Sequence, residues 1–145
     1  MKSFLVKDKV PIIRWKNIPN EIYFEGDIPE GYSLAVNPHD PYIVIDIDRH
    51  GDIDGYKNVP GKFSRELIET HSYDTKNKGS HHWFKYSGTK TLKNKASALG
   101  IDLRTNKGYV VYYPAMRGEG DIRDHIHLIK ESSPKMNIWL ETLFS

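Results

Sequence analysis

The sequence of 145 residues contains no cysteine, which excludes disulfide bonds and metal sites built on thiolates. This absence also agrees with a reducing compartment such as the cytoplasm. No apolar run is long enough to cross a bilayer, and the first ten residues, MKSFLVKDKV, are not apolar enough for a signal peptide. The G-x-x-x-x-G-K-[ST] loop of ATP-driven motors is missing as well. We therefore expect a cytoplasmic protein without a membrane interaction and without a helicase motor of its own.

The composition is that of a folded chain with one strongly basic segment. Hydrophobic residues make up 38%, which suffices for one packed core, and we expect a single domain over residues 1–145. The net charge is only +2, but the charged residues between positions 76 and 107 are all basic except for Asp102. Such a segment suits a polyanion such as a nucleic acid or a triphosphate. A solvated lysine-rich face produces the same pattern and is the more common explanation of charge alone.

Hydrophobic spacing and turn residues predict short strands mixed with a few helices. Strands are expected at residues 42–48, 79–86, 101–104 and 108–113 (the last one central), with extended pieces at 10–15 and 21–24 and an edge strand at 126–129. Helices are expected at residues 62–70, with Phe63, Leu67 and Ile68 on one side, at 91–99, and at 135–144, which would follow a cap at Ser133 and bury Met136, Leu140, Leu143 and Phe144. This mixture indicates an α+β fold with a mixed or antiparallel central sheet flanked by short helices.

The clearest strand, YIVIDID at residues 42–48, ends in two aspartates. Side chains alternate along a strand, so Asp46 and Asp48 share one face while the isoleucines point to the other. Two neighbouring carboxylates repel each other, and a divalent cation removes that repulsion. Hard oxygen ligands favour magnesium or manganese over zinc. An isolated D-x-D is nevertheless more often a strand face that meets water.

Two later segments could complete a site. In GSHHWF, Gly79 would allow a close backbone approach and His81 could donate to a phosphate oxygen or transfer a proton, whereas His82 would face the opposite side and pack. In GIDLR, Asp102 stands among apolar residues, where a buried acid is costly unless it is paired or bound to metal. Each residue taken alone has an equally good structural explanation.

A second pair of histidines, His125 and His127, is spaced to share one face of a strand. With no cysteine and no clear third ligand, an exposed strand is a better interpretation of this segment than a zinc site.

The segments YIVIDIDRHG, KGSHHWFKY and LGIDLRTNKGYVVYYPA together resemble the bifunctional primase-polymerase domain of the archaeo-eukaryotic primase superfamily, found in phage and plasmid replication proteins. The pattern of that family is a strand ending in D-x-D, a glycine-rich approach to a histidine, then G-I-D and a G-Y-V-V-x-P strand. The likeness spans residues 9–115 and begins with a K-x-P segment at Lys9. It departs from the pattern at Ser80, where a second glycine is usual, and at Ala115, where the family often ends in P-P-S.

The resemblance implies an RRM-like palm and template-dependent nucleotidyl transfer by a two-metal mechanism, in the cytoplasm of a host cell if the gene belongs to a phage. It implies that Asp46, Asp48 and Asp102 hold Mg²⁺ or Mn²⁺ and that His81 completes the catalytic set. The nucleotide-binding residues would be His81, Gly79, Ser80, Lys85, Arg104 and Lys9. The implied partners are a DNA template and primer, nucleoside triphosphates, and a replicative helicase, either in the same larger primase-helicase or as a separate protein. Two other classes stay open: a two-metal nuclease and a non-catalytic module that binds single-stranded nucleic acid.

Overall fold

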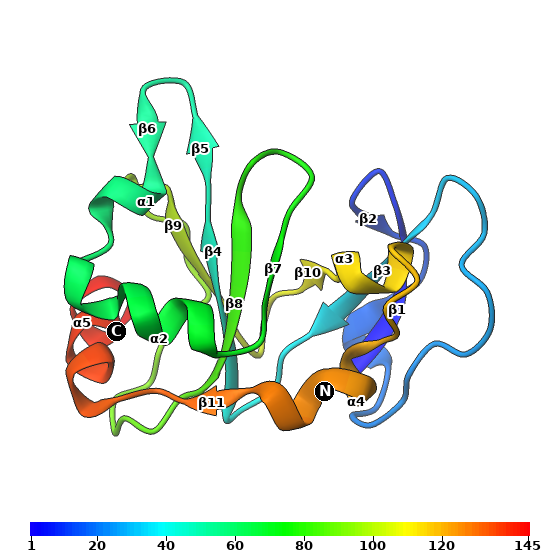
Figure 1. The fold of residues 1–145 in the computed structure, drawn as a ribbon. Helices are drawn as coiled ribbons and strands as arrows, with labels where there is room; N and C mark the ends of the chain where they lie inside the picture. The colour runs from blue at the N-terminus through cyan, green and yellow to red at the C-terminus, as the bar shows by residue number, and fades with distance from the viewer.

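Two β-sheets lie side by side in the computed structural model, which describes residues 1–145 (Figure 1). The first sheet has the order β10-β3-β1-β2, with every pair antiparallel, and is built from Lys2–Lys7 (β1), Val10–Pro11 (β2), Ser33–Asn37 (β3) and Val110–Val111 (β10). The second has the order β11-β8-β4-β9, and β7 also pairs with β8; its strands are Tyr42–Ile47 (β4), Ser72–Asp74 (β7), Ser80–Lys85 (β8), Ile101–Arg104 (β9) and Lys130–Glu131 (β11). Only β11 and β8 run parallel, and a separate hairpin joins Arg49–His50 (β5) to Ile53–Asp54 (β6).

Five short α-helices connect the strands, and the predicted α+β class is confirmed. They are Gly55–Asn58 (α1), Ser64–Glu69 (α2), Tyr113–Met116 (α3), Ile122–His125 (α4) and Pro134–Phe144 (α5), with 3₁₀ turns at Trp15–Asn17, Gly61–Phe63 and Ile126–Leu128. The hydroxyl of Ser133 caps α5 by accepting from the backbone of Met136, and Pro134 occupies the first turn, as predicted. None of the helices combines the length and apolar character that a membrane span requires.

The alternation along β4 divides the core into two parts. Ile43, Ile45 and Ile47 point toward α2 and α5, which cover the face of the second sheet that is turned away from the first sheet (Figure 1). On that side lies the larger apolar cluster, made of these isoleucines with Phe63, Leu67, Phe84, Leu92, Ile101, Leu103, Met136, Leu140 and Phe144. Val44 points the other way, toward the first sheet, where it packs in a second cluster with Trp83. The second sheet therefore packs apolar side chains on both faces, and Asp46, His81 and Asp102 share one of these faces toward the carboxyl end of β4.

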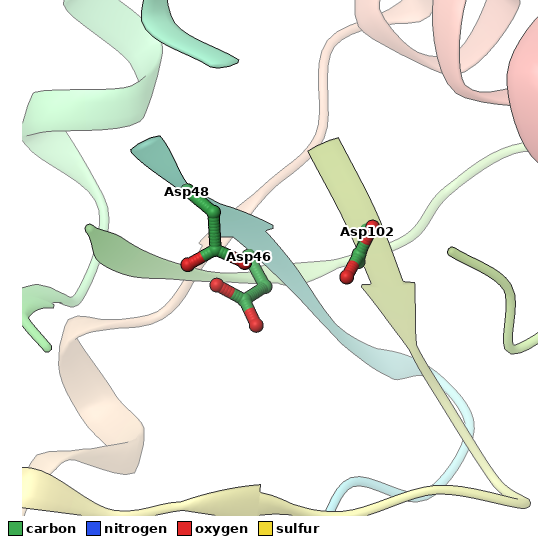
Figure 2. Close-up of side chains that lie close together, drawn as sticks. All are labelled: Asp46, Asp48 and Asp102. Atoms are coloured by element: carbon green, nitrogen blue, oxygen red, sulfur yellow. The ribbon is translucent and has the colours of Figure 1, made fainter. Parts of the chain in front are cut away.

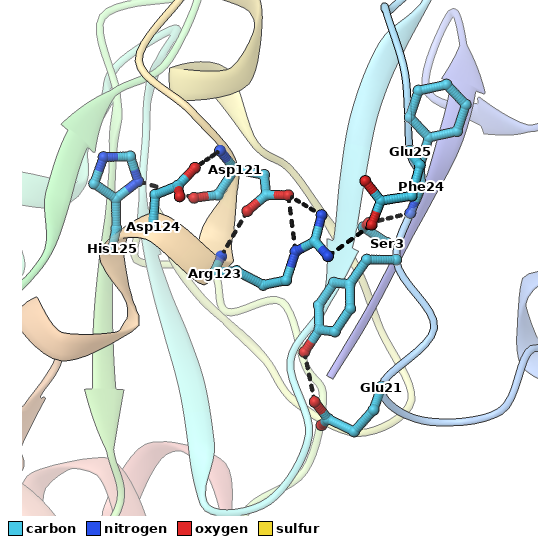
Figure 3. A network of polar contacts seen from close by, with 9 residues as sticks. Ser3, Glu21, Phe24, Glu25, Asp121, Arg123, Asp124 and His125 are labelled. Carbon is cyan, nitrogen blue, oxygen red and sulfur yellow. Dashed lines mark hydrogen bonds and ion pairs between the residues drawn. The ribbon is translucent and has the colours of Figure 1, made fainter.

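The long connection between β2 and β3 is held against α4 by polar contacts around Arg123 (Figure 3). The guanidinium of Arg123 donates to Glu25 at 2.7 Å and to Asp121 at 2.7 and 3.0 Å, and it lies over the ring of Tyr23. Asp121 also forms a capping box with Asp124 at the start of α4. This network fixes a connection that has no strand or α-helix of its own.

Several predicted helices and strands are wrong. Residues 91–99 are not helical, because Lys95 exchanges backbone hydrogen bonds with Leu103 at the free edge of β9, and this pairing requires an extended chain. The edge strand predicted at 126–129 is wrong: Ile126–Leu128 form a 3₁₀ turn after α4, because the capping box starts a helix just before them. His125 and His127 therefore do not share an exposed strand face, and His125 is half-buried.

Some predicted strands were too long, and some strands of the structure were not predicted. The strands β1 and β3 were not predicted, because their residues are buried on both faces and lack a clear alternation. In the segment 108–113 only Val110–Val111 is strand, because α3 begins soon afterwards at Tyr113 with Pro114 in its first turn. This strand lies at the edge of its sheet, whereas a central position was predicted. Similarly, 10–15 contains only the short β2, and 21–24 has no regular structure. Ile68 was predicted to share a side with Phe63 and Leu67, but it is 76% exposed. Phe63 belongs to a 3₁₀ turn, so the α-helical spacing of side chains starts only at Ser64.

Candidate active site

The three predicted aspartates come together because of the strand register in the second sheet. Asp46 on the central strand β4 lies directly opposite His81 of β8 on one side and Asp102 of β9 on the other. Residues in register share a face, so all three side chains point to the same side. Asp48 follows two positions later on that face, and the carboxylates of Asp46, Asp48 and Asp102 each place an oxygen within 4.8 Å of the others (Figure 2).

Backbone contacts with glycines fix Asp48 just beyond the end of β4. Its N–H donates to the carbonyl of Gly100 at 2.9 Å, and its carbonyl accepts from Gly55 at 2.8 Å. A Cβ added to Gly79 would lie 2.5 Å from the carbonyl oxygen of Ile47 and 3.0 Å from Oδ1 of Asp48. The absence of a side chain at Gly79 therefore lets its backbone approach the end of β4 closely, as predicted from the sequence. This close approach lies beside the carboxylates.

The electrostatics of this cluster favour a bound cation. Oδ1 of Asp46 is buried and accepts no hydrogen bond, and leaving a buried charged acceptor unpaired is costly. Burial raises the pKa of Asp48, and the negative charges of Asp46 and Asp102 raise it further. A divalent cation would satisfy the free oxygen and offset the repulsion, so the donor set fits a metal with hard oxygen ligands.

A hydrogen-bond chain orients the ring of His81. The indole N–H of Trp83 donates to the hydroxyl of Tyr73 at 3.1 Å, and that hydroxyl also lies 3.1 Å from Nδ1 of His81. Because the indole can only donate, the single hydroxyl proton of Tyr73 is free to go to Nδ1. This arrangement favours the tautomer of His81 that carries its proton on Nε2, and Nε2 lies 3.5 Å from Oδ1 of Asp46, too far for a good hydrogen bond. In that tautomer His81 presents an N–H donor that is not used by the protein.

Asp46, Asp48 and His81 form one wall of a cavity of about 450 Å³ between the two sheets, and Asp102 lies beside this wall without lining the cavity. The remaining walls come from the β1–β2 turn, the β7–β8 loop, Asn94 in the connection before β9 and the segment that runs from β9 into α3. The lining residues are Lys9, Asp46, Asp48, Thr75, Asn77, His81, Asn94, Arg104, Lys107, Gly108, Tyr109, Val110, Val111 and Tyr113. Arg104 also lies 3.7 Å from Asp102, so acidic and basic groups meet in the same cavity.

The family model for the N-terminal domain of bifunctional DNA primase/polymerases matches residues 7–134, which is most of the chain. The chain belongs to this primase/polymerase family. No curated protein matches it. Membership supports a function of the DNA primase/polymerase type, with binding of DNA and nucleotides, and the carboxylate cluster is compatible with the metal binding that such a function needs.

The structure brings most but not all of the predicted primase/polymerase residues to the cavity. Lys9, Arg104 and His81 line it. Ser80 points to the opposite face of β8, where its hydroxyl accepts from Tyr56 at 2.6 Å and bonds with His82 at 2.7 Å. Lys85 lies at the far end of β8, in register with Tyr42, and does not line the cavity. His82 is buried on the apolar side, as predicted.

Several lining residues were not singled out from the sequence. Lys107 belongs to the basic segment and Tyr113 to the last strand motif, so both had a weak signal. No sequence pattern points to Thr75, Asn77 or Asn94, because they reach the cavity through loops whose course depends on the packing of the two sheets.

Proposed function

We propose that this protein is a metal-dependent nucleotidyltransferase that extends a DNA primer on a template, and that residues 1–145 act as a single catalytic domain. The observation that carries the proposal is the buried, unpaired Oδ1 of Asp46 at the centre of a carboxylate cluster, in a cavity that also holds three basic side chains. A site that combines an unsatisfied carboxylate oxygen in an acidic cluster with nearby basic side chains suits a triphosphate bound together with divalent metal.

Asp46, Asp48 and Asp102 would hold the metal, and their oxygen ligands favour Mg²⁺ or Mn²⁺. When bound, such ions promote ionisation of the primer 3′ hydroxyl and neutralise charge on the α-phosphate and the leaving pyrophosphate. The strand register of β4, β8 and β9 supports this role because it holds the carboxylates in place before any ligand arrives.

The other residues of the cavity would bind the triphosphate. The N–H on Nε2 of His81 is an unused donor beside the carboxylates and would bind a phosphate oxygen. Lys9, Arg104 and Lys107 would offset the charge of the phosphates. Gly79 does not line the cavity and would act indirectly, by letting the start of β8 approach the carboxylates closely. Ser80 and Lys85 are not part of this proposal, because their side chains point elsewhere.

Substitution of one metal carboxylate tests the proposal. Asp48→Asn should reduce primer extension by at least about a hundredfold, because it removes an electrostatic group from the site of reaction. The same variant should lose most of the rise in melting temperature that manganese and a triphosphate give the wild type. Asp52→Asn, which changes an exposed acid of the β5–β6 turn outside the cavity, is the matched control and should behave as wild type in both assays.

Near wild-type extension by the Asp48→Asn variant would overturn the assignment. Shortening of labelled DNA by the wild type with manganese and no nucleotide would instead indicate a two-metal nuclease. DNA binding that ignores both metal and nucleotide would indicate a non-catalytic binding module.

A further inference from the structure

The hairpin of β1 and β2 extends the cavity outward along the first sheet. Lys9 in its turn lines the cavity, and the backbone carbonyl of Lys9 accepts a hydrogen bond of 2.9 Å from the hydroxyl of Tyr109, another lining residue. Figure 1 shows this turn rising at the same end of the molecule as the β5–β6 hairpin and the β7–β8 loop. Whatever occupies the cavity can therefore continue onto this hairpin without crossing the core.

The turn itself is tight and has no glycine. Lys7 pairs with Val10, so Asp8 and Lys9 form a two-residue connection, and their φ angles are 50° and 66°. Both central residues of such a turn need positive φ, which favours glycine. Lysine in this position keeps a long cationic side chain at the mouth of the cavity despite the unfavourable backbone, and strained positions of this kind are concentrated at functional sites.

Beyond the turn, the chain exposes apolar and basic side chains together. Val10, Ile12 and Ile13 are 63%, 52% and 51% exposed and stand almost consecutively, whereas other exposed aliphatic residues, such as Ile68, are isolated in the sequence. From residue 7 to 16 the basic residues are Lys7, Lys9, Arg14 and Lys16, and the only acid is Asp8. We call residues 7–16 the basic hairpin.

We propose that the basic hairpin binds a single-stranded nucleic acid, the template, as it passes the cavity; this inference rests on the proposed function. Its basic side chains attract phosphates, and its aliphatic side chains form an apolar surface on which the faces of unstacked bases can pack. A duplex hides its base faces, so it could use the cations but not the aliphatic surface. The combination therefore selects a single strand over a duplex.

The double variant Ile12→Ser/Ile13→Ser removes the aliphatic surface and leaves every charge in place. Fluorescence anisotropy with a labelled oligothymidylate should show affinity about tenfold weaker than wild type, because the buried apolar area is lost. Affinity for a duplex of the same length and for a triphosphate with manganese should stay unchanged. Val10→Ser alone, a smaller change, should weaken single-strand binding in the same direction.

The matched control is Ile68→Ser/Ile138→Ser, which replaces two isoleucines that are 76% and 65% exposed on α2 and α5. It should bind the single strand as wild type does. Unchanged single-strand affinity in the hairpin variants would overturn the inference, and so would an equal loss for single strand and duplex. A wild-type dimer that the hairpin variant abolishes, measured by light scattering, would assign the surface to a second copy of the chain.

The two proposals fail in different ways. If the wild type binds triphosphate and extends primers while the hairpin variants bind the single strand normally, only the template surface is wrong. If the hairpin variants lose the single strand but the wild type neither binds triphosphate nor extends primers, the surface stands and the enzymatic proposal is wrong.

Discussion

At the scale of single residues, Asp46 and His81 each have a polar atom without a hydrogen-bond partner in the protein. Oδ1 of Asp46 is buried without a donor, and Nε2 of His81 is 3.5 Å away, outside good hydrogen-bond range. A direct hydrogen bond between them would satisfy both groups, yet the register of β4 and β8 holds them apart. Groups left unpaired in this way are prepared to bind a ligand, with metal at the carboxylate and an anion at the imidazole.

Tyr73 is predicted to act through His81 as a positioning residue. Tyr73→Phe removes the donor to Nδ1 of His81, so the neutral ring is free to move its proton from Nε2 to Nδ1. We expect the KM for the triphosphate to rise about tenfold, in line with the loss of one charge-assisted hydrogen bond. Nitrogen-15 NMR of the histidine rings should report the loss of a fixed Nε2–H tautomer at His81.

Tyr23→Phe is the control for this prediction, because its hydroxyl donates to Glu21 on the surface, away from the cavity. It should leave both the tautomer and the KM unchanged. A His81 ring that keeps its Nε2 proton in the Tyr73→Phe variant would contradict the hydrogen-bond chain, whatever happens to the activity.

At the scale of elements, the site depends on two glycine backbones that meet around Asp48. A Cβ on Gly55 would lie 2.2 Å from the carbonyl oxygen of Gly100 and 2.9 Å from that of Asp48. Both obstacles are backbone atoms that carry the hydrogen bonds of Asp48, so they cannot move aside without moving the carboxylate. The start of α1 and the turn before β9 are thus packed against the end of β4.

Gly55→Ala should therefore destabilise the fold and weaken metal binding together. We expect the free energy of unfolding in urea to fall by about 2 kcal/mol, as for other over-packed positions. The affinity for manganese should fall in the same variant because Asp48 is displaced. Gly61→Ala is the control, since a Cβ there meets nothing within 4 Å, and it should leave both quantities unchanged. A stable Gly55→Ala protein with normal manganese affinity would show that this packing does not hold Asp48.

Element prediction succeeded where the pattern was local. The β-branched run of β4 and the serine-proline start of α5 both came from neighbouring residues. Residues 91–99 have the composition of a helix, but Lys95 pairs with the free edge of β9, a partner that no local pattern contains. Local sequence was also insufficient for Ser80, because its hydroxyl accepts a hydrogen bond from Tyr56 in α1.

At the scale of the whole molecule, a buried chain of polar groups links the second sheet to α4. The hydroxyl of Tyr112 lies 2.8 Å from Nε2 of His71 and 2.8 Å from Nδ1 of His125, and the two imidazoles stack. Burial, together with the charges of His125 and His127, lowers the pKa of His71 to about 4. The two parts of the fold are therefore joined through a histidine that must stay neutral.

This arrangement predicts a loss of stability in mild acid. Because the pKa of His71 in the folded state is below its ordinary value of 6.5, the unfolded chain takes up the proton first. Stability is full above that value and falls as the pH drops from 6.5 toward 4, by about 1.4 kcal/mol per pH unit from this group. Urea unfolding at several pH values measures the slope.

His71→Gln should lower that slope, whatever its effect on stability at neutral pH. His39→Gln changes a histidine outside the chain of polar groups and should keep the wild-type slope. An unchanged slope in the His71→Gln variant would assign the acid sensitivity to other groups.

Local sequence was enough to place Asp46 and Asp48 on one face of β4, because side-chain alternation is a property of any strand. Together with the later histidine and aspartate, it also determined the family, which the match over residues 7–134 confirmed. Only the tertiary structure decided that His81 and Asp102 lie on either side of Asp46, that Tyr73 orients the imidazole, and that Ser80 and Lys85 point elsewhere. Those outcomes depend on the register between strands distant in the chain and on the first sheet, which closes the cavity, and both are set by long-range packing.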